Sequence, residues 1–284
     1  MNCFKNTILV LISICFLGAP AFAAEQSKTL LFGKIESNLW EATASVFLHL
    51  ADDDQQADRT SLADYRDDVE TIDRMVAKLE KMPVREVLER LVAAGLDSIP
   101  GGGAEILEDG VRRQIWSRAK ASTEQWLGVH REAHELGLRT TATMMFGVGE
   151  PVSARITHLL GVRNLQDDTG GFTAFIPWTF QDSSTDLEGE VEPSGGHDYL
   201  RTLAISRLAL DNVDHVQGSW VTQGPKVGQV SLFFGADDLG SIMLEENVVA
   251  AAGAQYRMTQ SEMERVIQEA GYSPRQRRTL YEPL

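Results

Sequence analysis

The chain has 284 residues, of which 43% are hydrophobic and 24% charged, a composition typical of one large globular domain or two small ones. The formal net charge is −15. Because phosphate binding needs clustered Lys and Arg, this acidity argues against a nucleic-acid-binding protein.

Residues 1–23 have the pattern of a secretory signal peptide. Lys5 precedes an apolar run over residues 7–17, and residues 21–23 read Ala-Phe-Ala, an A-x-A cleavage site before Ala24. The run is too short to span a bilayer. We expect an exported, periplasmic protein with no membrane span after cleavage. The alternatives are an uncleaved anchor, or a cytoplasmic protein whose start codon is misassigned.

Only two cysteines occur, Cys3 and Cys15, and both lie in this segment. The cleaved chain would have none. It could then form no disulfide, no thiolate zinc site, no cysteine nucleophile and no ordinary iron–sulfur cluster.

Residues 24–83 form an acidic, partly helical N-terminal segment. Residues 51–70 carry many acids and are typical of a solvated loop or helix face. Apolar side chains at helical spacing predict a helix over 68–82.

From residue 84 onward, apolar runs with helical spacing alternate with short β-rich runs. The expected helices cover 85–95, 123–137, 154–168, 199–212 and 259–271, with Gly137 as a stop and Thr259 as an N-cap. The expected strands cover 96–100, 138–147, 171–180, 216–224 and 227–238.

Strands and helices alternating at roughly 30-residue spacing predict parallel βα units and an α/β fold. A complete (β/α) barrel needs eight strands, and residues 24–83 do not supply the remainder. The sequence therefore predicts a partial (β/α) barrel over 84–284, preceded by the helical segment. A barrel of this kind builds its site at the C-terminal ends of the strands.

The glycine run in 98-SIPGGGAEIL-107 is the most conspicuous local motif. It lacks the Gly-Lys-Ser/Thr of a phosphate-binding P-loop, and Ile106 stands where G-x-G-x-x-G requires glycine. Two readings stay open: a backbone cradle for a small molecule, or a tight turn between strand and helix.

A set of ordered stretches resembles one enzyme family over about residues 84–282. They are PGGGAEIL, GLRTTATMMFG, LQDDTGGFTAFIPWTFQ, YLRTLAISRLALDN, SWVTQGPKVGQ, GADDLGSIMLEENVVAAAG and RQRRTLY. Together they resemble the C-terminal two-thirds of dehypoxanthine futalosine cyclase, a radical S-adenosylmethionine enzyme of the futalosine route to menaquinone. FIPWTFQ and SWVTQG favour this family over the related aminofutalosine synthase.

The resemblance implies a radical S-adenosylmethionine barrel with a [4Fe–4S] cluster, and dehypoxanthine futalosine as substrate. The chain departs from the family at two points. No CxxxCxxC motif is present, and residues 148–151 read Val-Gly-Glu-Pro where the family reads His-Val-Glu-Thr. We therefore expect a cyclase-like protein that cannot hold a cluster by itself. The alternatives are a non-catalytic nucleoside-like binding protein and the product of a truncated or chimeric cyclase gene.

The resemblance and the strand-end positions together predict the site residues; no catalytic residue is predicted. Cofactor-binding candidates are Gly101, Gly102, Gly103, Glu105, Arg112 and Glu150. Substrate-binding candidates are Trp178, Gln181, Ser219, Gln223, Lys226 and Glu246.

Several of these residues also have a purely structural reading. Glu105 and Arg112 could form a surface ion pair, Glu150 could be a helix N-terminal acid, and Trp178 could belong to the core.

His130 and His134 lie four residues apart on a predicted helix, a spacing seen in metal sites. The residues between them do not form an HExxH motif, and no metal site is predicted. Surface or half-buried structural histidines are expected instead.

Overall fold

The computed structural model describes residues 82–93, 95–115, 121–182, 189–192, 194–242 and 256–284. The expected signal peptide lies outside these ranges. So do the acidic segment apart from residues 82 and 83, and the helix expected over 68–82 apart from residue 82. The chain divides into two compact units, Met1–Ile99 and Pro100–Leu284. Among the described residues, no helix is both long and apolar enough to cross a bilayer.

The first unit contributes helix α5 (Val84–Ala93) and the short strand β1 (Ser98–Ile99). α5 buries Val87 and Leu88 on one face, as its apolar spacing predicts. The helix expected over 85–95 is thereby confirmed.

The second unit is built on three parallel strands in chain order, β2 (Arg139–Phe146), β3 (Phe172–Thr179) and β4 (His215–Val216). Met145 lies opposite Trp178, and Ala174 lies opposite His215. The parallel α/β arrangement expected from the alternating pattern is confirmed.

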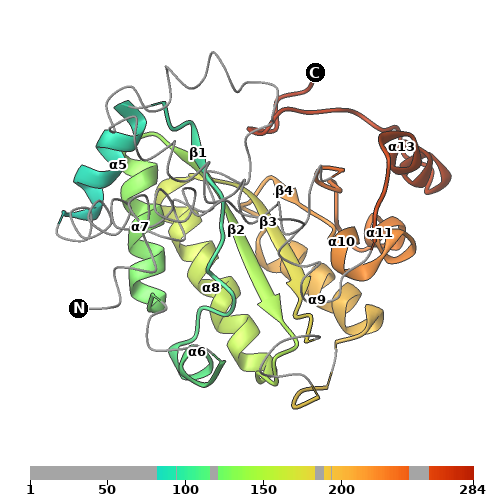
Figure 1. Ribbon diagram of the computed structural model, residues 1–284, viewed down its shortest axis with the longest axis horizontal. Helices are drawn as coiled ribbons and strands as arrows, with labels where there is room; N and C mark the ends of the chain where they lie inside the picture. The colour runs from blue at the N-terminus through green and yellow to red at the C-terminus, as the bar shows by residue number, and fades with distance from the viewer. Residues whose placement is uncertain (1–81, 94, 116–120, 183–188, 193, 243–255) are drawn as a thin grey trace, which may run out of the picture. The chain divides into compact units, whose positions relative to one another are not determined.

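Three helices lie side by side along one face of this sheet: α7 (Thr123–Glu135), α8 (Val152–Thr169) and α9 (Gly196–Ala209) (Figure 1). Aromatic contacts join them to the strands. Phe146 stacks on Tyr199 with centroids 6.4 Å apart, and the edge of His158 meets Phe175 at 6.0 Å. This face holds the main hydrophobic core.

The other face of the sheet is less covered. Side chains alternate between the faces of a strand, and paired residues on parallel neighbours share a face. Thr143, Ile176 and Trp178 on this face are half-buried, although Met145, the partner of Trp178, is 4% exposed; Ala142 and Phe175 on the helix side are fully buried.

The two strands expected over 216–224 and 227–238 are wrong in most of their length. Of residues 216–238, β4 includes only Val216. The helices α10 (Trp220–Gln223) and α11 (Pro225–Ser231) follow it. Pro225 at the first helical position favours a helix start. Gly228 lets α11 approach α10, because an added Cβ would lie 2.7 Å from the Trp220 Cβ.

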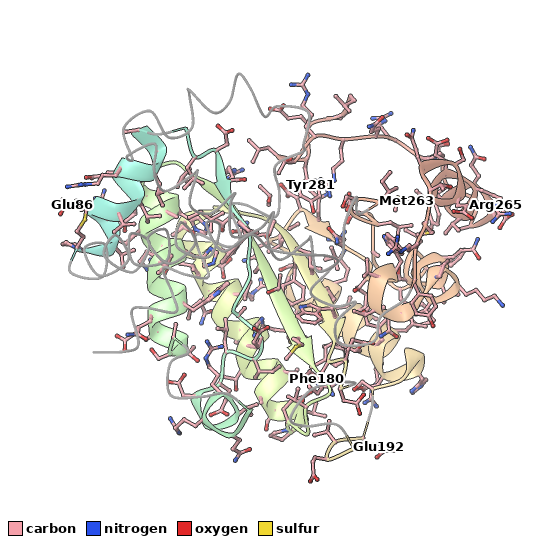
Figure 2. All side chains as sticks on the ribbon, viewed as in Figure 1. Glu86, Phe180, Glu192, Met263, Arg265 and Tyr281 are labelled. Carbon is pink, nitrogen blue, oxygen red and sulfur yellow. The ribbon has the colours of Figure 1, made fainter. Side chains whose placement is uncertain are left out.

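The other helices of the described residues are α6 (Asp109–Ile115), which was not expected, and α13 (Gln260–Glu269). The helix ends follow the expected signals. Thr259 and Glu262 form a capping box, and Gly137 adopts φ 81° after α7. Phe180, just after β3, and Tyr281 of the C-terminal residues lie at opposite ends of the sheet (Figure 2).

Candidate functional site

The loops that follow the strands meet at the C-terminal edge of the sheet. The Phe180 N–H donates to the Phe146 carbonyl at 2.8 Å and so joins the ends of β2 and β3. This edge is where parallel α/β folds place ligands.

The glycine run lies directly against β2. The Gly101 N–H donates to Thr141 Oγ1 at 2.9 Å, and Thr143 Oγ1 donates to the Gly101 carbonyl at 2.6 Å. Trp126 Nε1 donates to the Gly102 carbonyl at 3.1 Å. A Cβ at Gly101 would lie 2.6 Å from the Thr141 carbonyl oxygen. Close approach to the protein's own backbone therefore accounts for this glycine.

We expect Gly101→Ala to lower the free energy of unfolding by about 1–3 kcal/mol, because the clash is with backbone that cannot rotate away. Urea denaturation measures the effect. Gly128→Ala in α7 is the matched control, because an added Cβ there meets nothing within 4 Å. It should stabilise by about 0.5–1 kcal/mol through helix propensity. Equal effects of the two changes would contradict the close-approach argument.

Arg112 fixes the loop after the glycines. Its side chain is buried, with the residue 5% exposed. The guanidinium donates to the carbonyls of Gly103 at 3.2 Å, Ile106 at 3.2 Å and Ala121 at 2.5 and 2.9 Å, and also to that of Ala104. These bonds hold the backbone of the predicted cofactor loop.

Glu105 has φ 44°, a left-handed backbone conformation that residues with a Cβ seldom adopt. Its carbonyl accepts from the Met145 N–H at 2.9 Å, which ties the loop to β2. Strain of this kind clusters at functional sites, since the surrounding structure must maintain it.

Glu150 is part of a buried ionic network at the end of β2. Its side chain is 0% exposed. The carboxylate accepts from the Gly147 N–H at 2.9 and 3.0 Å, from the Val148 N–H at 2.8 Å and from Arg155 Nε at 2.7 Å. Arg155 also bonds Asp198 at 2.9 Å and so links this loop to α9. Glu150 thus shapes its own loop.

Two predicted substrate residues meet at the end of β3. Gln181 Nε2 and Gln223 Nε2 donate to Thr179 Oγ1 at 3.1 and 2.5 Å. The Ser219 N–H donates to the Tyr199 hydroxyl at 2.6 Å, and burial raises the pKa of Tyr199.

The other predicted substrate residues are more scattered. Trp178 is half-buried on the sheet face away from the helices. Lys226 is exposed on α11, and Glu246 lies outside the described residues.

Three histidines are structural. His158 Nδ1 accepts from the Leu107 N–H at 3.0 Å, and burial lowers its pKa to about 3. His130 and His134 both bond Thr140 Oγ1, at 2.9 and 2.7 Å. His130 is 2% exposed, deeper than the surface or half-buried position expected from the sequence.

Sequence analysis did not predict a role for Arg155. It also did not predict the cluster that Arg277 and Tyr281 form with Asp238 and His215. Arg277 pairs with Asp238 at 2.5 and 2.8 Å, and its guanidinium lies 3.8 Å from the centre of the Tyr281 ring. Tyr281 stacks on His215 at 4.3 Å. Arg155 follows Glu150 by five residues in the sequence. This spacing of an acid and an arginine at the end of β2 is the signal that could have indicated their ion pair.

The sequence of the chain is similar to that of known proteins. Residues 169–284 match the family model described as the CofH/MqnC C-terminal region. This part of the chain is similar to the C-terminal region of that family. The match includes β3, β4 and the loops that carry Gln181, Ser219 and Gln223.

Two full-length relatives contain a similar sequence. The chain is 50% identical over 209 residues to cyclic dehypoxanthine futalosine synthase of Streptomyces coelicolor, covering 74% of this chain and 52% of that protein. It is 46% identical over 210 residues to aminodeoxyfutalosine synthase of Thermus thermophilus, covering 72% and 56%. The resemblance identified from the sequence is confirmed, and the chain spans about half the length of the curated relatives it matches.

Among solved structures, methylornithine synthase superposes with a TM-score of 0.50 over 68% of this chain and 56% of that protein. At 17% identity this shows the fold alone. The CofH/MqnC C-terminal region thus lies in an α/β fold that is compatible with a partial barrel.

Proposed function

We propose that this chain is a cyclic dehypoxanthine futalosine synthase-like protein of the futalosine route to menaquinone, and that its strand-end loops bind a nucleoside-like small molecule. The 50% identity over 209 residues carries this proposal. The half-buried Trp178 supports it, because a partly exposed aromatic side chain can stack against a planar ring.

The family's [4Fe–4S] cluster does not fit the donors of this chain. A CxxxCxxC motif supplies three thiolates, and the sequence has two cysteines, Cys3 and Cys15, twelve positions apart. Within the described residues, no group of three His, Cys, Asp or Glu could hold a metal ion. We propose that the chain binds its ligand but forms no radical by itself. A non-catalytic nucleoside-like binding protein is the second candidate, and the same thiolate count favours it.

S-adenosylmethionine is the cofactor proposed for the loop at 101–105. The Glu105 carboxylate would accept hydrogen bonds from the amino group of the ligand, and the left-handed backbone at this residue supports such a role. The carbonyls of Gly101, Gly102 and Gly103 are bonded within the protein, so the glycines would act by letting the loop lie close to β2.

Titration calorimetry tests the binding proposal. We expect heat of binding with S-adenosylmethionine and with dehypoxanthine futalosine. Glu105→Gln should weaken the first and Trp178→Ala the second, each by roughly tenfold, since one charge-assisted hydrogen bond or one stacking contact contributes about 1–2 kcal/mol.

Tyr272→Ala is the aromatic control, because Tyr272 is 47% exposed, packs on Phe233 and is not a predicted ligand-binding residue. Circular dichroism checks that each variant is folded. No heat with either ligand would remove the proposal.

Export is proposed from residues 1–23. Its test is the N-terminal sequence of the protein recovered from its source: a mature chain beginning at Ala24 supports export, and an intact Met1 refutes it.

A further inference from the structure

Gln217 directly follows β4, and its side chain faces away from the helices. Its N–H donates to the Phe175 carbonyl at 2.9 Å, so it continues the pairing of β4 with β3. Both of its neighbours face the helices: Val216 is 0% exposed, and a Cβ on Gly218 would lie 2.3 Å from a side-chain oxygen of α11. Because side chains alternate along a strand, Gln217 shares a sheet face with Trp178.

Gln217 and Trp178 are diagonal neighbours on this face. The register places Gln217 level with Ile176, and Trp178 lies two residues further along β3. A strand spacing of about 4.8 Å and a rise of about 3.3 Å per residue then put the Cα atoms of Gln217 and Trp178 roughly 8 Å apart. The side chain of a glutamine is long enough to reach the edge of a ring that stacks on Trp178.

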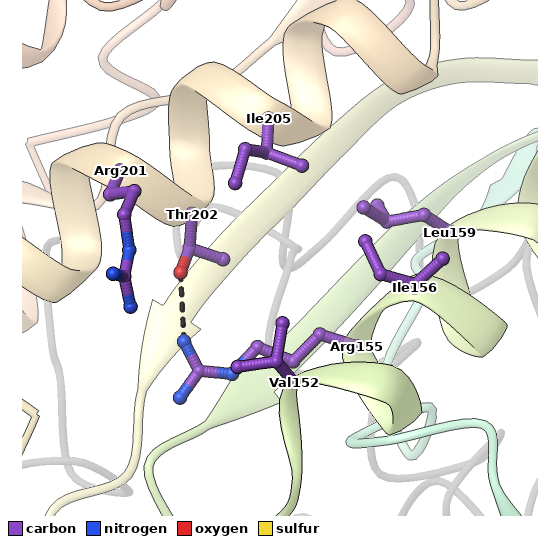
Figure 3. Close-up of a pocket in the computed structure, with 7 residues that line it drawn as sticks. All are labelled: Val152, Arg155, Ile156, Leu159, Arg201, Thr202 and Ile205. Carbon is purple, nitrogen blue, oxygen red and sulfur yellow. Dashed lines mark hydrogen bonds between the residues drawn. The ribbon is translucent and has the colours of Figure 1, made fainter.

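The Gln217 carboxamide has no hydrogen-bond partner among the described residues. Other polar side chains of the fold do have partners. Gln166 donates to the Phe172 carbonyl at 3.0 Å and accepts from the Phe172 N–H at 2.8 Å. In the groove between α8 and α9, Arg155 donates to Thr202 at 2.9 Å (Figure 3). A half-buried amide without a partner costs stability, and ligand-binding residues commonly carry such a cost.

The loop after Asp238 holds this carboxamide in place. A Cβ on Gly240 would lie 2.6 Å from Gln217 Nε2 and 2.8 Å from its Cδ, so the amide packs directly on the Gly240 backbone. The Gly240 N–H donates to Asp238 Oδ1 at 2.6 Å, and Arg277 donates to the same oxygen at 2.8 Å. A polar group positioned in this way needs little further ordering when it binds a ligand.

We propose that Gln217 is a specificity-determining residue, whose carboxamide hydrogen-bonds the polar edge of the ring that stacks on Trp178. This inference rests on the proposed binding of a nucleoside-like ligand and names the residue that selects it. A carboxamide both donates and accepts, so it pairs with a carbonyl, carboxylate or amide on the edge of the ring. A purely apolar ring would leave the amide unpaired and would bind more weakly.

Titration calorimetry with dehypoxanthine futalosine and with S-adenosylmethionine tests the role of Gln217. Gln217→Met keeps the length of the side chain and removes its hydrogen bonds. We expect this variant to bind dehypoxanthine futalosine roughly tenfold more weakly, because a hydrogen bond to the ligand is lost. It should bind S-adenosylmethionine as the wild-type chain does, since that ligand is proposed for the loop at 101–105. Gln268→Met, on the exposed surface of α13, is the matched control and should leave both affinities unchanged.

Urea denaturation separates ligand binding from a structural role. Because the Gln217 side chain has no partner to lose within the described residues, Gln217→Met should leave the urea midpoint unchanged or raise it. A lower midpoint, weaker binding of both ligands, or an unchanged affinity for dehypoxanthine futalosine would each overturn the inference and leave the proposed function standing. If the wild-type chain gives no heat with dehypoxanthine futalosine, the proposed binding of that ligand fails, and the inference fails with it.

Discussion

Arg112→Met should lower the free energy of unfolding by about 3 kcal/mol or more, because it orphans several buried carbonyl groups at once. Methionine keeps most of the length of the side chain but donates no hydrogen bond. The carbonyls of Gly103, Ala104, Ile106 and Ala121 would each lose a donor. Urea denaturation followed by circular dichroism measures the loss.

Arg113→Met is the matched control. Arg113 is the next residue on α6 and is exposed, so its replacement should change stability by about 0.5 kcal/mol or less. If both variants unfold at the same urea concentration, Arg112 does not hold the loop as its contacts indicate.

The protein should also lose stability steeply as the pH falls below about 6.5. Burial lowers the pKa of His130 and of His158 from 6.5 to about 3, and that of the half-buried His134 to about 4. In the unfolded chain these rings take up a proton near pH 6.5. Below that pH the unfolded state binds more protons than the folded state, so stability falls with pH until the folded pKa values are reached.

His130 and His158 together should give a slope of about 2.7 kcal/mol per pH unit well below pH 6.5, since each fully shifted proton contributes about 1.36. His134 adds less because it is partly solvated. Urea midpoints at pH 7.5, 6.0 and 5.0 measure the slope. His158→Gln should flatten it by about half, since an amide oxygen can still accept from the Leu107 N–H. The exposed His197→Asn should leave it unchanged. Equal stability at pH 7.5 and 5.0 would contradict the assignment.

The sequence predicted those elements whose local signals agree with their packing. α8 and β3 form where a helix over 154–168 and a strand over 171–180 were expected, and Thr259 caps α13 as its motif indicates. The region after β4 was predicted wrongly because short apolar runs fit a strand or a helix equally well. There the packing of Gly228 on Trp220 decides in favour of a helix.

The candidate site was only partly predictable. The structure brings Gln181 and Gln223 together on Thr179, but Gln223 lies on α10 and not at the end of a strand as expected. Strand-end position could not show that Arg112 is bonded within the protein, because the carbonyls that it bonds are backbone groups that every residue carries. Glu150 is bonded both to backbone N–H groups and to the Arg155 side chain. A charged side chain that binds a ligand and one that holds a loop through backbone carbonyls therefore look alike in the sequence. The second can be recognised only when its partner is another charged side chain.

The most direct test of the account is product formation by this chain alone. Purified protein is incubated anaerobically with iron and sulfide, then with a reductant and S-adenosylmethionine, and 5′-deoxyadenosine is measured by chromatography. We predict none, while calorimetry on the same sample still detects S-adenosylmethionine binding. Formation of 5′-deoxyadenosine above a protein-free control would contradict the claim that this chain binds nucleoside-like ligands without generating a radical.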